Sequence, residues 1–297
     1  MLCNYSYIHI FTGAMKKLNL SFLLLNIGYA EHHSDWNWYN ISNPFFRIYY
    51  VAAGHAWVTI DGKDYPMTEG HLYMIPPMTI HNDNCNSTFQ LYYLHVLEEP
   101  QNEVSIFDLK TFPFEISATD FEINLIKRVL KINPNKGLAF YDPEKYTGKP
   151  FITNPFIGPN NYDFIETKGI LLVLFSRFLA LAKEAILTQD NRILKATRFI
   201  REHLSEPIKI KNLSDECCLS EDHFIRLFKK EMGVTPIEYV NRKKIEQCQL
   251  RLLLSEDSIQ EVAYTVSIFN ISYFNKLFKK IVGTTPTRFK NNYNANS

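Results

Sequence analysis

The sequence predicts an α+β protein of two domains, over residues 1–188 and 189–297. Its 297 residues suit about two domains of ordinary size. From about residue 18 to 100, short runs rich in aromatic and β-branched residues alternate with turn residues, which predicts a barrel or sandwich of strands. Helical spacing of apolar residues follows. In the last third one residue pattern occurs twice, which predicts an all-helical domain built from a duplicated unit.

Turn residues mark the strands of the first domain. Asp61-Gly62 lies between two strand-like runs and is a strong signal for a two-residue hairpin turn. Gly70 and Pro76-Pro77 bound the run His71–Ile75, and Phe89–Leu97 is a further strand. Many short strands at near-regular spacing therefore predict a closed or sandwiched sheet.

The apolar run Leu18–Ala30 has two interpretations. It follows Lys16 and Lys17, and a basic start before an apolar run resembles the leader of a secreted or membrane-tethered sensor. The run is too short to span a bilayer. We expect a buried strand of the first domain instead.

Two helices are predicted after the strands, at about 119–132 and 163–187. Between them, residues 133–162 carry five prolines and predict a long irregular loop, a candidate lid or inter-domain contact. The second helix is apolar on much of its circumference. We therefore expect one of its faces to pack on the sheet and the other to form a homodimer.

Charge separates the two domains, with a polar boundary at 188–191. Residues 191–297 hold 18 Lys or Arg and 12 Asp or Glu, a net +6, whereas residues 1–190 hold 14 and 19, a net −5. A basic domain behind an acidic one favours nucleic acid as a partner.

The five cysteines include no CxxC pair, so they predict neither a disulfide framework nor a thiolate zinc site. They favour reduced thiols in the cytoplasm.

The duplicated unit is the sharpest feature of the sequence. The first copy reads Phe224-x-x-Leu227-Phe228-Lys229-Lys230-x-x-Gly233-x-Thr235-Pro236. The second, 50 residues later and with eight identities, reads Phe274-x-x-Leu277-Phe278-Lys279-Lys280-x-x-Gly283-x-Thr285-Pro286. A match of this length indicates two copies of one structural unit.

Each copy predicts a helix-turn-helix. A short helix, at about 209–217 and again at 258–266, precedes a tight turn and a second helix capped by Ser220 or Asn270. In the second helix, apolar residues at i, i+3 and i+4 form a buried face and the cations point elsewhere. One long helix, about Pro236–Leu254, joins the units. The two second helices are therefore expected to enter major-groove segments about 34 Å apart.

These motifs resemble the DNA-binding domain of the AraC/XylS family of bacterial transcription regulators. The resemblance covers about residues 190–293 and rests on Leu219-Ser220-x-x-His223-Phe224-x-x-Leu227-Phe228-Lys229 and Ser272-Tyr273-Phe274-x-x-Leu277-Phe278-Lys279-Lys280. The family commonly has Gly in the turn of each unit, where this sequence has Cys218 and Ser267. A turn that needs a positive φ costs more without Gly, so we expect both turns to form under strain.

The resemblance implies which side chains meet DNA. Arg226 suits guanine, Ile225 a thymine methyl and Asn275 adenine. Asp222 would accept a hydrogen bond from cytosine or, alternatively, stabilise the start of its own helix. His223 and Tyr273 are expected to be half-buried, and the paired lysines to lie on phosphate. The predicted set is Ser220, Asp222, His223, Ile225, Arg226, Lys229, Lys230, Asn270, Ile271, Ser272, Tyr273, Asn275, Lys276, Lys279 and Lys280.

The first domain resembles the cupin-like sensor barrel that often precedes this DNA-binding domain. Gly54 and Gly70-x5-Pro76-Pro77-x3-His81 are similar to cupin motifs, but Ile60 and Gly62 stand where metal ligands would be. We therefore predict no metal and no cofactor, and a small-molecule pocket whose aromatic walls could alternatively be plain core. The predicted effector-binding residues are Trp36, Arg47, Tyr49, Tyr73, His81 and His95.

Together these features predict a cytoplasmic, sequence-specific transcription regulator that binds promoter DNA, senses a sugar or related metabolite, and is not an enzyme. RNA polymerase is a further candidate partner, and no membrane contact is expected. The alternative is a cupin-type metal-dependent enzyme with an appended helical domain.

Overall fold

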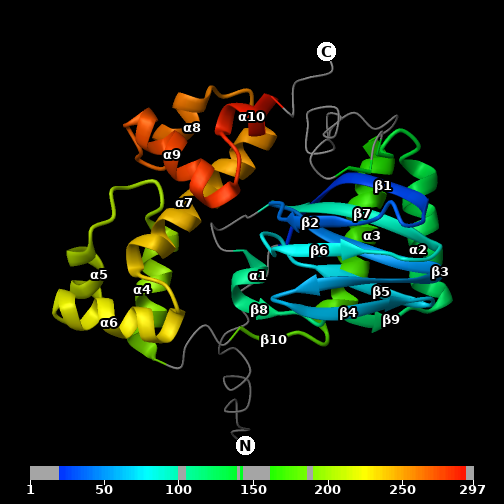
Figure 1. Ribbon diagram of the computed structural model, residues 1–297, viewed down its shortest axis with the longest axis horizontal. Coiled ribbons are helices and arrows are strands. Elements are labelled where there is room, and N and C mark those ends of the chain that lie inside the picture. The colour runs from blue at the N-terminus through cyan, green and yellow to red at the C-terminus, as the bar shows by residue number, and fades with distance from the viewer. Residues whose placement is uncertain (1–19, 100–104, 139–140, 143–160, 186–189, 292–297) are drawn as a thin grey trace, which may run out of the picture.

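A computed structural model describes residues 20–99, 105–138, 141–142, 161–185 and 190–291. A sheet-rich first domain and a helical second domain lie side by side (Figure 1). The predicted boundary at 188/189 falls outside the described residues. Across the described part of the chain, no helix is both long enough and apolar enough to cross a membrane.

The first domain is built on an eight-stranded antiparallel sheet. Its strands run in the order β1-β7-β3-β5-β9, with β4 and β6 paired to β3 and β2 paired to β6. Their bounds are Phe22–His32 (β1), Trp38–Ile41 (β2), Phe46–Ile60 (β3), Lys63–Thr68 (β4), His71–Ile75 (β5), His81–Asn84 (β6), Phe89–Glu98 (β7) and Glu115–Ser117 (β9).

The long strand β3 bends the sheet onto itself. Its first part pairs with β5 and β7, and its second part pairs with β4 and β6. The register shifts between Val51 and Ala53, and Gly54 follows with a φ of +77°. A Cβ on Gly54 would lie 2.1 Å from the Thr88 carbonyl oxygen, so only glycine fits where β3 turns past β7. The result is a cupin-like double layer, although hydrogen bonds between the described strands do not close it into a barrel.

Two sequence predictions within the sheet are confirmed. Asp61 and Gly62 join β3 to β4 with φ angles of 51° and 75°, as a type I′ hairpin turn requires. The run from Phe22 to His32 is a strand that pairs along its length with β7, and most of its residues are buried.

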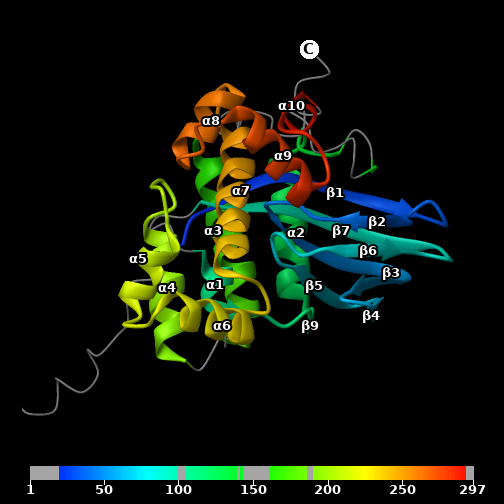
Figure 2. The same ribbon diagram turned by 60° about the vertical axis from the view of Figure 1, so that its left-hand side comes forward.

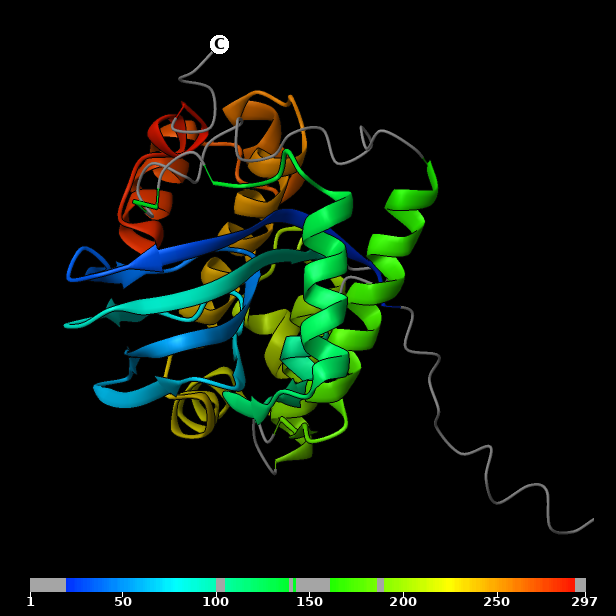
Figure 3. The same cartoon turned by 90° about the vertical axis from the view of Figure 1, so that its right-hand side faces the viewer.

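Helices α2 (Asp120–Ile132) and α3 (Asn161–Leu179) cover one face of the sheet (Figure 3). Ile48 and Tyr50 of β3 point into the apolar cluster under these helices, whereas Tyr49 and Val51 point between the two layers of the sheet. The sequence alone left this orientation open. In the structure, the odd-numbered residues of the first part of β3 point into the space between the two layers of the sheet.

The prediction of one helix over 163–187 was wrong at its end. Helix α3 stops at Leu179, because Lys183 and Glu184 form β10, which pairs with β8 (Lys110–Thr111). That pairing joins segments far apart in sequence, which helical periodicity cannot anticipate. The short helix α1 (Ile106–Leu109) precedes β8 and was not predicted.

The second domain contains the two predicted helix-turn-helix units, joined by α7 (Figure 2). Helix α7 spans Pro236–Leu254, as predicted. The first unit comprises α4 (Asn191–Glu202), α5 (Ile210–Glu216) and α6 (Glu221–Met232), and the second comprises α8 (Ile259–Thr265), α9 (Ile271–Val282) and α10 (Pro286–Asn291). Each unit has its own apolar core, one against the start of α7 and one against its end.

The predicted N-cap residues and turns are present in both units, although only the Asn270 side chain accepts a cap hydrogen bond and that of Ser220 does not. Gly233 and Gly283 end α6 and α9 in the left-handed conformation. Cys218 and Ser267 have φ angles of 54° and 56°, so both turns form with a positive φ on a residue that has a side chain. The strain expected from the missing glycines is therefore built into both turns.

Candidate DNA-binding surface and effector pocket

The second helix of each unit buries aromatic residues and exposes cations. Phe224 and Phe228 of α6 and Phe274 and Phe278 of α9 are fully buried. The opposite faces are open to solvent. Of the predicted DNA-binding residues, three are half-buried, namely Ile225, Ile271 and Asn275. The others are exposed: Ser220, Asp222, His223, Arg226, Lys229, Lys230, Asn270, Ser272, Tyr273, Lys276, Lys279 and Lys280.

Some predicted residues also have structural roles. Asn270 caps α9, because its side-chain oxygen accepts a hydrogen bond from the Tyr273 amide at 2.9 Å. Tyr273 is 49% exposed, and His223 is exposed as well, so the expectation that both are half-buried was wrong. Both lie beside a buried phenylalanine but on the solvent side of their helix. The Oδ1 atom of Asn275 is buried and lacks a hydrogen-bond partner among the described residues.

The positive charges of the two units influence the same carboxylate. Hydrogen bonds from Thr235 and the charges of Lys280 and Lys229 lower the pKa of Glu238, at the start of α7. Within the described residues, no carboxylate lies within ion-pair distance of Arg226 or of the paired lysines. Their charge is therefore available to a polyanion.

The six predicted effector-binding residues are all buried between the layers of the sheet. Three of them, Trp36, Tyr49 and His95, line one hollow, which is the candidate effector site and is called the effector hollow below. The structure does not bring Tyr73 there, since its hydroxyl accepts a hydrogen bond from the Thr68 amide at 2.8 Å. Arg47 and His81 do not line the hollow directly. Its remaining walls are His32, Trp38, Asp83, Leu91, Tyr93, Leu138 and Tyr141.

Asp83, which lines this hollow, is close to the buried His81 side chain. His81 Nε2 is 3.7 Å from Asp83 Oδ1, and both side chains are almost completely buried. Burial raises the pKa of Asp83 to about 7, although the charge of Arg47 opposes the shift. Burial and the charge of Arg47 lower the pKa of His81 to about 3 and that of His95 well below its usual value. Both imidazoles are therefore neutral near pH 7.

Several residues that line the effector hollow were not predicted from the sequence. Asp83 lies two positions after His81 on the same strand, so alternation along β6 places the two side chains on one face and could have identified Asp83. Tyr93 had a weaker signal. A Cβ on Gly28 would lie 2.2 Å from its hydroxyl oxygen, which accepts a hydrogen bond from the Leu138 amide at 2.8 Å. Gly28 therefore makes room for a ring that holds Leu138 over the hollow.

Two family models match the chain in the regions just described. The AraC-like ligand binding domain matches residues 19–100, and the helix-turn-helix domain matches residues 213–292. The chain belongs to the AraC family of transcription regulators. The effector hollow lies within the first matched region, apart from Leu138 and Tyr141.

Two relatives match most of the length of this chain. The uncharacterized HTH-type transcriptional regulator YfiF of Bacillus subtilis is 24% identical over 277 residues, covering 91% of this chain and 82% of YfiF. YisR of the same organism, with the same description, is 26% identical over 243 residues, covering 78% of this chain and 80% of YisR. An apo form of a ToxT variant from Vibrio cholerae superposes over 92% of this chain and 97% of its own with a TM-score of 0.53. At 13% identity that likeness shows the fold alone.

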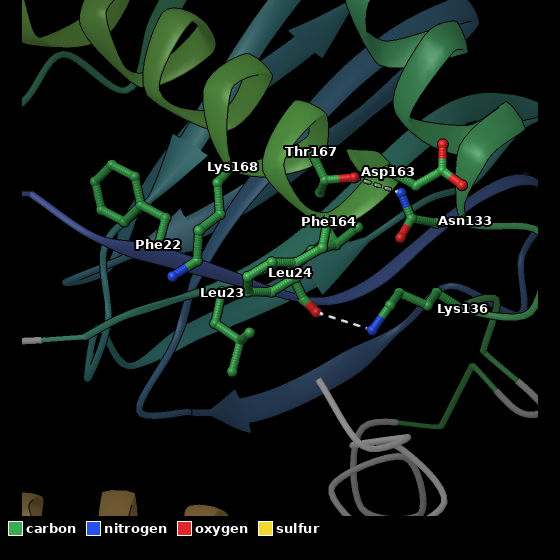
Figure 4. A pocket seen from close by; sticks show the side chains of 9 residues that line it. All are labelled: Phe22, Leu23, Leu24, Asn133, Lys136, Asp163, Phe164, Thr167 and Lys168. Carbon is green, nitrogen blue, oxygen red and sulfur yellow. Dashed lines mark hydrogen bonds between the residues drawn. The ribbon is translucent and has the colours of Figure 1, made fainter. Parts of the chain in front are cut away.

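The effector hollow of this AraC-family chain is small as it stands. Its volume of about 20 Å³ has room for roughly one water molecule. A second hollow of the same size lies between β1 and α3 (Figure 4). Several of its polar groups have partners, since Asn133 donates to Thr167 at 2.9 Å and Lys168 to Glu99 at 2.9 Å.

A larger hollow of about 670 Å³ lies between the two domains, where β2 faces residues 282–289. None of the predicted effector-binding residues lines it, but Trp38 lines both this hollow and the effector hollow. In the described part of the chain, no three His, Cys, Asp or Glu side chains gather as a metal site.

Proposed function

We propose that this regulator binds promoter DNA by placing α6 and α9 in two successive major-groove segments. The observation that carries this proposal is a pair of exposed, basic second helices on a single connecting helix. Arg226 would read guanine, and Lys229, Lys230, Lys279 and Lys280 would contact phosphates. A site of about two helical turns is the expected target.

Selection of genomic fragments by the purified chain, at two salt concentrations, tests this proposal. We expect enrichment of an asymmetric site whose affinity falls steeply with salt, because each phosphate contact releases counterions. Absence of enrichment at both salt concentrations would contradict it. Since DNA lies in the cytoplasm of bacteria, the same proposal places the protein there, with RNA polymerase as a further partner.

The effector we propose is a small, uncharged, polyhydroxylated compound such as a sugar. Aromatic rings form the walls of the hollow, and the charges of Arg47 and Asp83 balance when both are ionised. Of the residues that line the hollow, Trp38 and Asp83 have a polar atom, Nε1 and Oδ1, that is buried without a hydrogen-bond partner among the described residues. A polyol both donates and accepts hydrogen bonds, so it could satisfy both.

Entry of such a ligand requires the hollow to open. Leu138 and Tyr141 line it from the predicted loop at 133–162, most of which lies outside the described residues, and they support a role of this loop as a lid. A ToxT structure is described as bound to an unsaturated fatty acid, but a long acyl chain would leave the polar groups of this hollow unpaired. Titration of the intrinsic fluorescence of the three tryptophans, of which Trp36 and Trp38 line the hollow, with sugars, carboxylic acids and fatty acids separates these classes. A response to fatty acids alone would contradict the proposal.

We also propose a homodimer that forms through α3. Tyr162, Ile165 and Leu172 are 66%, 69% and 38% exposed, and Gly169 and Ser176 continue the same stripe with the alternating three- and four-residue spacing of a helix–helix seam. A second copy of α3 is the partner that such a stripe fits, since small residues allow close approach. Sedimentation of Ile165→Asp should show a monomer, whereas Ile80→Asp, at a site 61% exposed elsewhere, should not change the mass.

A further inference from the structure

The two helix-turn-helix units share little apart from α7. The core of the first unit includes Tyr239 and Val240 of α7, and the core of the second includes Ile245 and Cys248. No buried apolar residue belongs to both clusters among the described residues. The relative placement of α6 and α9 therefore depends on α7 and on polar contacts between the units.

Lys244 lies at the junction of these two cores. It is 5% exposed, and its Nζ donates to two backbone carbonyls, each at 2.7 Å. One is the carbonyl of Glu206, in the connection between α4 and α5 of the first unit. The other belongs to Val266, at the end of α8 in the second unit. A single buried ammonium thus joins one unit to the other.

Ser267 makes a second bridge beside it. Its hydroxyl donates to the carbonyl of Ser205, next to the Glu206 carbonyl that Lys244 holds. Ser267 keeps a φ of 56° in the turn where the family commonly has Gly. Glycine would suit that conformation better but could not make the bridge. A longer contact, Asn241 to the Tyr273 hydroxyl at 3.4 Å, also links α7 to α9.

We propose that Lys244 and Ser267 are positioning residues that fix the spacing and rotation of α9 relative to α6, and so make the protein selective for one spacing between the two halves of its DNA site. This inference rests on the proposed function. Adding or removing one base pair rotates one half-site by roughly a tenth of a turn and moves it by about 3.4 Å. A rigid pair of helices cannot follow that change, whereas a loosened pair can.

The test compares binding of the full chain to its selected DNA site and to the same site with one base pair inserted or removed between the halves. For the unmodified protein we expect about a tenfold or greater loss of affinity on either altered spacing. Lys244→Met removes both bridging hydrogen bonds and keeps the length of the side chain. It should bind the original site about tenfold more weakly and prefer it over the altered spacings by less than about twofold.

Matched variants separate positioning from folding and from charge. Lys131→Met removes the same charge from an exposed site on α2 and should leave the spacing preference unchanged. Ser267→Ala and Ser267→Gly both remove the bridging hydroxyl, but only glycine relieves the positive φ. Both should relax the spacing preference. If a thermal melt shows that Lys244→Met is not folded, these two variants test the inference in its place.

Three outcomes overturn the inference. In one, the unmodified protein binds all spacings equally, which leaves the proposed function intact. In another, folded Lys244→Met and both Ser267 variants keep the full preference. If no DNA is selected at all, the inference falls together with the proposed function.

Discussion

Arg226 and Lys229 lie one turn apart on the exposed face of α6 and test two kinds of DNA contact. Arg226→Ala should cost about 1–3 kcal/mol and relax specificity at one base, because it removes a bidentate contact to that base. Lys229→Ala is the matched control. It should weaken binding to all DNA sequences alike, and it should reduce the slope of log affinity against log salt concentration by about 1. Affinities for single-base variants of the selected site, at several salt concentrations, distinguish the two, and equal weakening by both would refute the base-reading role of Arg226.

Asp83 should make the stability of the first domain depend on pH. Its pKa rises from 3.8 to about 7, so the folded protein keeps a proton that the unfolded chain releases. The stability that this proton contributes is complete below about pH 4 and is lost as the pH rises through 7. His81 and His95, with lowered pKa values, act with the opposite sign. The free energy of unfolding of the unmodified protein, plotted against pH, therefore sums these opposing contributions and does not show that of Asp83 by itself.

Asp83→Asn makes that contribution visible. The free energy of unfolding of the variant, minus that of the unmodified protein, should increase between about pH 4 and 7 and then level off, by at most a few kcal/mol at about 1.4 kcal/mol per pKa unit. The two histidines are present in both proteins, so their effect largely cancels in the difference. Urea titrations at four pH values measure it. Parallel stability curves for the two proteins would show that Asp83 titrates normally.

At the scale of elements, the two helix-turn-helix turns offer a matched pair. Cys218 and Ser267 both have a positive φ, but no described hydrogen bond involves the Cys218 side chain, whereas the Ser267 hydroxyl bridges to Ser205. Cys218→Gly should raise the free energy of unfolding by about 1 kcal/mol, because glycine relieves the strain. Ser267→Gly should gain less, since it also loses a hydrogen bond. Thermal melts of the two variants compare them, and an equal gain would contradict a structural role for the Ser267 hydroxyl.

How far the sequence predicts each element depends on how local its cause is. The duplicated unit, the long helix over Pro236–Leu254 and the hairpin at Asp61-Gly62 follow from local residue patterns, and all three are present. The bend of β3 and the end of α3 depend on pairing with distant strands, and neither was predicted. The effector hollow falls between these cases. Trp36 and Tyr49 of its walls were predicted, whereas Tyr93 and Tyr141 were not, and Asp83 could have been found only from its alternation with His81.

At the scale of the whole molecule, the domains meet where α7 crosses α1. Lys243 Nζ of α7 lies 2.8 Å from Asp108 Oδ1 of α1 and 2.9 Å from Glu246. Burial alone would lower the pKa of Lys243, but Glu246 and Asp108 outweigh it and raise the pKa. Leu250 packs nearby on the cluster of Leu23, Leu25, Phe45 and Leu97. An effector that binds this arrangement and a looser one with different affinities could shift the balance between them.

Asp108→Asn should loosen this contact without unfolding either domain. A hydrogen bond between charged groups contributes about 1.5–3 kcal/mol, and the neutral amide keeps only part of it. Amide hydrogen exchange in residues 106–109 and 239–250 should therefore become faster, while exchange in α9 stays unchanged. Glu166→Gln makes the same chemical change in an ion pair with Arg128, 2.6 Å long, that lies within the first domain, and it should leave exchange in α7 as it is. If both variants give the same exchange pattern in α7, Asp108 does not hold the second domain against the first.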